Sequence, residues 1–218
     1  MEELYIDSVA HRYGKRQIIN NVYLKCEKGE VVGILGRNGC GKSTLLKIIF
    51  GSVKPQYKHL KINGKLINTG YKTKQISYLP QENFLPAKLR VETIVRLFVN
   101  KYQDIVYGIE FISKYLQTPL SMLSGGELRL VECLMILYSD SDYVLLDEPF
   151  SQLAPLIADE VKRHINNLKP VKGFIVTDHH YRQILSISSR VVLLHNGGNY
   201  TINSEEDLKL HGYLPPDK

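Results

Sequence analysis

Apolar and polar residues alternate along the first 30 positions, and this alternation predicts two strands at residues 4–9 and 18–24. A second alternating stretch, at residues 60–67, is divided by Asn63 and Gly64. An Asn-Gly pair between alternating segments is typical of a tight β-hairpin, because both residues accept positive φ angles. We therefore expect an antiparallel β flap that this hairpin extends.

Short apolar runs without alternation occur later in the chain, and such runs are typical of strands buried on both faces. They lie at residues 31–35, 76–79, 143–146, 174–177 and 191–194. Between them lie helical patterns at residues 91–100, 109–116 and 127–138. Strands that alternate with helices favour right-handed crossovers in a covered sheet. The predicted fold class is α/β, with a mainly parallel sheet, the β flap and a short helical lobe inserted at about residues 82–135.

Length, charge and cysteine content narrow the class of protein. A chain of 218 residues indicates one domain spanning residues 1–218, and three scattered cysteines do not make a disulfide framework or a metal site. The net charge of +6 would suit nucleic acid or an anionic membrane surface, but its lysines are spread along the chain. We therefore interpret the charge mainly as a solvated surface and do not expect a nucleic-acid partner. Because residues 1–13 lack a signal-peptide core and no apolar run reaches the roughly 18 residues that span a bilayer, we expect a cytoplasmic protein.

The run at residues 31–35 leads into a loop that fits the pattern G-x-x-x-x-G-K-[S/T]. Glycines let successive N–H groups converge on phosphate oxygens, and the following helix points its positive end at the same anion. The pattern predicts a P-loop NTPase core in which Lys42 binds the β and γ phosphates and Ser43 ligates Mg²⁺. The residues expected to bind ATP here are Gly36, Asn38, Gly39, Cys40, Gly41, Lys42, Ser43 and Thr44.

Polar residues follow three further strands, and ligands of parallel sheets bind at the carboxyl ends of strands. Asp147 is expected to hold Mg²⁺ through water, and Glu148 to polarise the water that attacks the γ-phosphate. Gln81 is placed to reach the metal and this water, and His179 the γ-phosphate. Taken singly, each has a structural alternative: the acidic pair and Gln81 as caps of strands, and His179 as a packed histidine.

The segment LSGGE, at residues 123–127, predicts a second helix whose N-terminus binds an anion. Ser124 can cap a helix, Gly125 and Gly126 permit close backbone approach, and Glu127 suits the first helical turn. Two anion sites in one small domain require an explanation.

With these motifs in this order, the chain resembles the nucleotide-binding subunit of an ABC transporter. The resemblance implies a head-to-tail dimer around two ATP–Mg²⁺, in which Ser124, Gly125 and Gly126 of one copy complete the site on another copy or on a homologous ATPase subunit. It implies that Tyr13 stacks on adenine. It also implies that Glu148, His179, Gln81 and Lys42 carry ATP hydrolysis, and that Ser43, Gln81 and Asp147 surround the metal.

The same resemblance implies integral membrane transporter subunits as partners and a peripheral place on the cytoplasmic face of the cell membrane. In motif style the chain is similar to the subunits of lipopolysaccharide export and branched-chain amino-acid uptake. It departs from the family at Ala154, where an Asp usually communicates across the dimer, and in the short stretch between Gln81 and Ser124. His180 is an alternative to His179. The alternative functions are a soluble ABC ATPase, as an assembly scaffold or nucleic-acid machine, and a regulator that dimerises on ATP.

Overall fold

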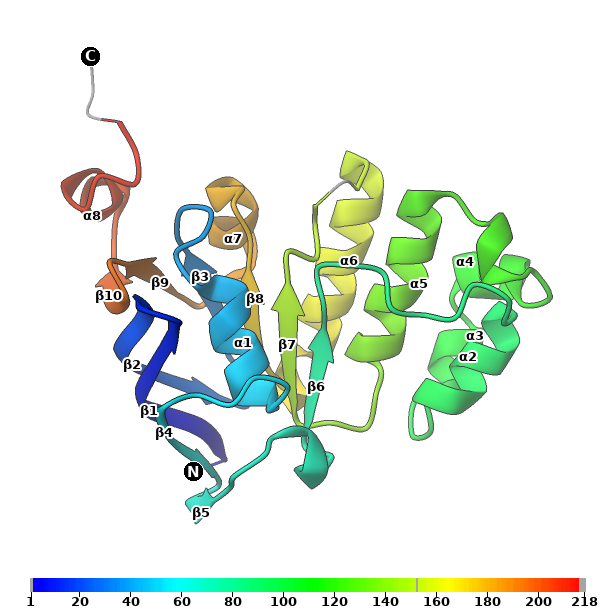
Figure 1. Cartoon of the computed structure of the whole chain (residues 1–218). Helices are drawn as coiled ribbons and strands as arrows, with labels where there is room; N and C mark the ends of the chain where they lie inside the picture. Colours follow the sequence, from blue (N-terminus) through cyan, green and yellow to red (C-terminus); the bar gives the residue numbers. More distant parts are fainter. Residues whose placement is uncertain (1, 152, 216–218) are drawn as a thin grey trace.

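A computed structural model describes residues 2–151 and 153–215 of the chain. Its larger sheet has the strand order β10-β9-β3-β8-β7-β6, and all neighbours run parallel except the β10–β9 pair (Figure 1). The strands are β3 (Val31–Leu35), β6 (Ile76–Leu79), β7 (Tyr143–Asp147), β8 (Gly173–Thr177), β9 (Arg190–His195) and β10 (Gly198–Ile202). The five predicted buried strands are therefore confirmed, and β10 is an addition at the edge.

The smaller sheet is antiparallel and has the order β2-β1-β4-β5. It consists of β1 (Glu3–Tyr13), β2 (Arg16–Glu27), β4 (Tyr57–Ile62) and β5 (Lys65–Leu66). The predicted hairpin is confirmed, because Asn63 and Gly64 join β4 to β5 with φ angles of 51° and 77°. β1 and β2 are longer than predicted, since bulges near Ser8 and Asn21 break the alternation without ending the pairing.

Eight α-helices occur in the described residues. Most of them cover the parallel sheet or form the lobe beside it, and α8 lies next to β10 at one edge (Figure 1). They are α1 (Lys42–Phe50), α2 (Val91–Phe98), α3 (Gln103–Tyr107), α4 (Glu110–Tyr115), α5 (Gly125–Leu137), α6 (Pro155–Leu168), α7 (Tyr181–Ile187) and α8 (Glu205–Leu210). Short 3₁₀ turns lie at Tyr71–Thr73, Leu120–Met122 and Lys169–Val171. No helix of the described residues has the length and apolarity needed to cross a membrane.

Alternate residues of the central strands pack into two separate cores. Leu145 and Ile175 face α1 and the antiparallel sheet, whereas Val144, Leu146 and Val176 face α5, α6 and α7. Both faces of the parallel sheet are thus covered, which explains why its strands read as unbroken apolar runs. The lobe helices α2 to α4 pack against α5 through apolar residues such as Val95 and Ile112. This arrangement leaves the carboxyl ends of the parallel strands open to ligands.

Candidate functional site

One cavity of about 600 Å³ lies at the carboxyl ends of β3, β6, β7 and β8. Most of the residues predicted to contact nucleotide or metal line it. The lining residues are Tyr13, Ile18, Asn38, Gly39, Gly41, Lys42, Ser43, Thr44, Gln81, Glu148, Ser151 and His179. The open sheet therefore brings four strand ends to one site, as parallel α/β sheets do.

The loop between β3 and α1 is shaped by its glycines. Gly41 has a φ of 112°, which a residue with a Cβ atom rarely adopts, and a Cβ on Gly36 would lie 2.7 Å from the Leu194 carbonyl oxygen. Lys42 is buried, and its ammonium donates a hydrogen bond to the carbonyl oxygen of Gly36 across 2.7 Å. The loop thus places Lys42 in the lining of the cavity, and its glycines permit the close backbone approach that a phosphate requires.

Two residues of the predicted loop set do not line the cavity. Cys40 directs its thiol toward Gly36, since a Cβ on Gly36 would lie 2.5 Å from Sγ, and its side chain packs against an apolar core. Burial raises the pKa of the Cys40 thiol. Contacts of Gly36 and Cys40 with nucleotide stay a prediction. Such contacts would come from their backbone groups.

Asp147 is fully buried at the end of β7 and is surrounded by hydroxyl donors. Its Oδ1 accepts hydrogen bonds from Ser43 Oγ, across 3.0 Å, and from Thr177 Oγ1, across 2.9 Å. Its Oδ2 accepts a hydrogen bond from the Tyr78 hydroxyl across 3.0 Å. Burial, and to a lesser degree the negative charge of Asp147, raise the pKa of Tyr78 far above its usual range. A hydroxyl and a carboxylate are hard oxygen donors, so Ser43 and Asp147 fit the ligand preference of Mg²⁺.

Glu148 has a φ of 49°, in the left-handed region that a residue other than glycine or asparagine seldom occupies. Its N–H donates to the carbonyl oxygen of Thr177 across 3.0 Å, which fixes this conformation. Its Oε2 accepts a hydrogen bond from the Gln81 amide across 2.9 Å and lies 3.5 Å from Nδ1 of His179. The strained backbone turns a carboxylate into the cavity from the end of a buried strand.

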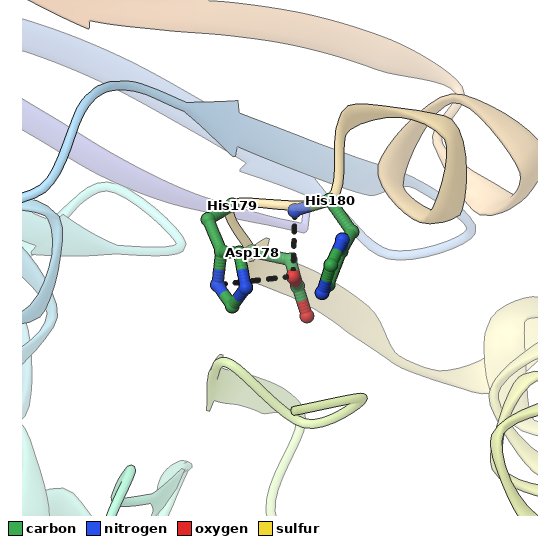
Figure 2. A group of neighbouring side chains, drawn as sticks. All are labelled: Asp178, His179 and His180. Carbon is green, nitrogen blue, oxygen red and sulfur yellow. Dashed lines mark hydrogen bonds and ion pairs between the residues drawn. The ribbon is translucent and has the colours of Figure 1, made fainter. Parts of the chain in front are cut away.

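The two adjacent histidines occupy different places. His179 lines the cavity beside Glu148. His180 is the N-cap residue before α7, and its N–H donates to Oδ1 of Asp178 across 2.8 Å (Figure 2). His179 is thus the histidine that faces the candidate catalytic carboxylate. Tyr13 lies at the end of β1, half exposed on the cavity rim, with its ring 4.6 Å from the ring of His11 in an edge-to-face arrangement.

Sequence reasoning missed a buried ion pair that connects α5 to the site. The guanidinium of Arg129 donates to the carbonyl oxygens of Pro80, across 2.8 Å, and Asp147, across 3.2 Å. The guanidinium also forms an ion pair with the Glu132 carboxylate at 3.3 Å. This carboxylate accepts a hydrogen bond from the N–H of Phe84 across 2.7 Å. Two opposite charges three positions apart, in the mainly apolar run from Leu128 to Leu137, are the signal that would have identified this pair.

Ser124 caps α5 in a reciprocal capping box. Its Oγ accepts the N–H of Glu127 across 3.3 Å, and the Glu127 carboxylate accepts the N–H of Ser124 across 2.8 Å. A Cβ on Gly125 would meet nothing within 4 Å, and one on Gly126 only Ile157 at 3.5 Å. Packing within the chain therefore does not require either glycine. Ser124, Gly125 and Gly126 are absent from the lining of the cavity that holds Lys42.

Ala154 occupies the N-cap position of α6, and its side chain makes no cap hydrogen bond. The helix begins instead with Pro155, whose fixed φ suits the first turn. The departure at Ala154 thus leaves the start of α6 intact.

Comparisons with known sequences agree on one family. The ABC transporter family model matches residues 19–151. An uncharacterized ABC transporter ATP-binding protein of Rhizobium meliloti is 31% identical over 211 residues, which cover 90% of this chain and 78% of the relative. The lipopolysaccharide export system ATP-binding protein LptB of Escherichia coli K12 is 30% identical over 213 residues, which cover 90% of this chain and 88% of the relative.

Solved structures share the fold. An ATP-binding subunit of an ABC transporter superposes with a TM-score of 0.84 at 23% identity, covering 98% of this chain and 95% of the other. The ADP conformation of MJ1267, an ATP-binding cassette of an ABC transporter, gives a TM-score of 0.79 at 24% identity, covering 96% and 94%. The predicted α/β class with a P-loop core, a mainly parallel sheet and a β flap is confirmed.

Proposed function

The chain belongs to the ABC transporter family as an ATP-binding subunit with ATPase activity, and on this premise we propose that two copies close head to tail around two ATP–Mg²⁺. In this dimer, Ser124, Gly125 and Gly126 of one copy lie over the γ-phosphate held by Lys42 of the other. The partner is a second copy or a homologous ATPase subunit. Residues 1–218 then form one ATP-binding domain, with the helical lobe at about residues 82–135 inserted in its core.

One observation supports the dimer most strongly: Gly125 and Gly126 have free space where a Cβ would be, yet they lie outside their own chain's cavity. Glycine is an unfavourable helix residue, and packing within the chain does not require it at these two positions, so close approach of a ligand is the reason that fits them. A helix start with a polar cap and open backbone suits a phosphate that another copy presents.

The proposed hydrolysis depends on positioning and on neutralising charge. Tyr13 stacks on the adenine ring, and the loop N–H groups with Lys42 hold the phosphates. Ser43, Gln81 and Asp147 would hold Mg²⁺, with Asp147 acting through water, and the ion would supply positive charge beside the phosphates.

Glu148 then orients the attacking water and accepts its proton. Gln81 and His179 contact the same Glu148 oxygen and set its direction toward the γ-phosphate. These two residues keep the carboxylate within reach of the water that it activates.

We further propose that this cycle powers a membrane transporter, with the chain bound to integral membrane subunits on the cytoplasmic face. The relatives named for lipopolysaccharide export support an export or uptake role of this general kind. The alternative is a soluble ABC ATPase, as an assembly scaffold or nucleic-acid machine. The net charge of +6 is the feature that keeps a nucleic-acid role open.

Co-purification from detergent extracts tests the choice between these roles. A transporter subunit is recovered with a multi-span membrane protein, and its phosphate release responds to that partner. Recovery without a membrane protein, together with ATPase stimulation by DNA or RNA that falls steeply with salt, contradicts the transport role.

A further inference from the structure

We propose that Asp178, His179 and His180 form an inhibitory binding site for a borderline-soft divalent cation such as Zn²⁺. One ligating atom from each of the three side chains lies within 4.8 Å of the others, and the described residues contain no other such group of three. Figure 2 shows the Asp178 carboxylate beside the two imidazole rings. The site is separate from the Ser43 and Asp147 pair assigned to Mg²⁺.

The distances within the cluster require only a small adjustment to bind a metal. Asp178 Oδ1 lies 3.7 Å from Nδ1 of His179, and the centroids of the two histidine rings are 4.1 Å apart. Ligands of tetrahedral Zn²⁺ at about 2.1 Å stand about 3.4 Å from one another. Both histidines are exposed, so rotation of their rings is unhindered by a packed core.

Asp178 supplies an independent indication of a ligand. The residue is fully buried, and its Oδ2 has no hydrogen-bond partner among the described residues. A buried carboxylate oxygen without a hydrogen-bond donor destabilises the fold, because it has lost its hydrogen bonds to water and formed no others. Oδ1 already accepts the His180 N–H, so a cation bound at this carboxylate would also supply the partner that Oδ2 lacks.

The donor set selects the kind of metal. Two imidazoles and one carboxylate suit Zn²⁺ and related transition metals, whereas Mg²⁺ prefers oxygen ligands and keeps its waters. Three protein ligands leave a coordination position for water. We therefore expect reversible Zn²⁺ binding that excess Mg²⁺ does not displace.

Metal binding would withdraw His179 from Glu148. Nδ1 of His179 stands 3.5 Å from the Glu148 carboxylate and 3.7 Å from the Asp178 carboxylate, so it lies between the two. A nitrogen that ligates a metal at Asp178 is no longer available to Glu148. Hydrolysis then stops while the phosphate loop still binds ATP. The inhibition rests on the proposed role of His179, whereas the binding of metal does not.

Calorimetry with Zn²⁺ alone tests the site in the full chain. We expect one Zn²⁺ per chain, with binding at least about tenfold weaker in His180→Gln. His180 is exposed and outside the catalytic set, so this variant should fold and hydrolyse ATP normally without Zn²⁺. His59→Gln, in the antiparallel sheet, is the matched control and should bind like the wild type. Absence of binding, or equal binding by His180→Gln, overturns the site.

Phosphate release at buffered free Zn²⁺ with excess Mg²⁺ tests the inhibition. We expect Zn²⁺ to inhibit the wild type and His59→Gln, to spare His180→Gln, and to leave the affinity for a fluorescent ATP analogue unchanged. Bound Zn²⁺ without inhibition overturns the regulatory role. An inactive wild type without Zn²⁺ contradicts the proposed ATPase mechanism instead, and calorimetry still decides the metal site.

Discussion

The side-chain amide of Gln81 donates a hydrogen bond to Oε2 of Glu148 across 2.9 Å, although the residues lie 67 positions apart in the chain. The bond joins the loop after β6 to the end of β7. His179 approaches the same oxygen from the end of β8. Three strand ends therefore converge on one carboxylate beside the phosphate loop, which makes Glu148 the residue whose removal is most informative.

Replacing Glu148 by Gln removes the carboxylate that accepts the proton of the attacking water. Loss of a general base typically lowers the rate by about 10²- to 10⁴-fold. We expect phosphate release to fall at least about 10²-fold while ATP still binds. Glu206→Gln, an exposed substitution in α8, should keep normal activity. Near-normal turnover of Glu148→Gln would remove this residue from the proposed role.

Replacing Lys42 by Ala removes the buried ammonium of the phosphate loop. A hydrogen bond to a charged group contributes about 1.5 to 3 kcal/mol, so ATP binding should weaken roughly 10- to 100-fold. Lys47→Ala, on the exposed face of the same helix, should bind ATP within about twofold of the wild type, because surface charges contribute little. Equal affinities of the two variants, measured with a fluorescent ATP analogue, would show that Lys42 does not bind the phosphates.

Replacing Ser124 by Ala removes the N-cap of α5 and should destabilise the folded chain by about 1 kcal/mol. In a protein of this size the midpoint of thermal unfolding should fall by about 2 to 4 °C. Ser121→Ala, in the preceding 3₁₀ turn, is the control and should leave the midpoint unchanged. An unchanged midpoint in Ser124→Ala would mean that the capping box does not contribute to stability.

The apolar runs predict the parallel strands well because both faces of that sheet are covered. β1 and β2 exceed their predictions, since positive-φ residues Ser8 and Asn21 interrupt the alternation that marks a strand. α6 was not predicted, although Ala158, Val161, Ile165 and Leu168 show its helical spacing and are buried.

The site residues were predictable where a motif or a strand end marks them. Tyr78 and Thr177 were not, because their bonds to Asp147 depend on the lateral order of β6, β7 and β8. Thr177 lies opposite Asp147 in the parallel register, which no local pattern specifies. The Arg129–Glu132 pair likewise needs the packing of α5 against the strand ends.

Lys172 gives the stability of the protein a distinct pH dependence. Its buried ammonium donates to the carbonyl oxygens of Leu137, across 2.9 Å, and Ser139, yet burial lowers the pKa of Lys172 from 10.5 to about 8. Below about pH 8 both the folded and unfolded states carry the proton, and the full cost of burying the charge is present. Between about pH 8 and 10.5 the unfolded chain binds more protons, so the free energy of unfolding rises with pH.

Urea unfolding measures this effect as the difference in free energy of unfolding between the wild type and Lys172→Met. We expect the wild type to gain stability relative to Lys172→Met as the pH rises from 8 to 10. Lys88→Met, at an exposed position, should follow the wild type throughout. A constant difference between the wild type and Lys172→Met over this range would contradict the lowered pKa.

The head-to-tail dimer is tested most directly by light scattering of Glu148→Gln with and without ATP and Mg²⁺. We predict that ATP converts the chain, of 24.9 kDa, to twice that mass. Adding Ser124→Arg should keep it monomeric although ATP still binds, whereas adding Ser121→Arg should leave the dimer intact. A Glu148→Gln chain that stays monomeric with bound ATP would contradict closure between two identical copies, and a dimer that survives Ser124→Arg would contradict the head-to-tail arrangement.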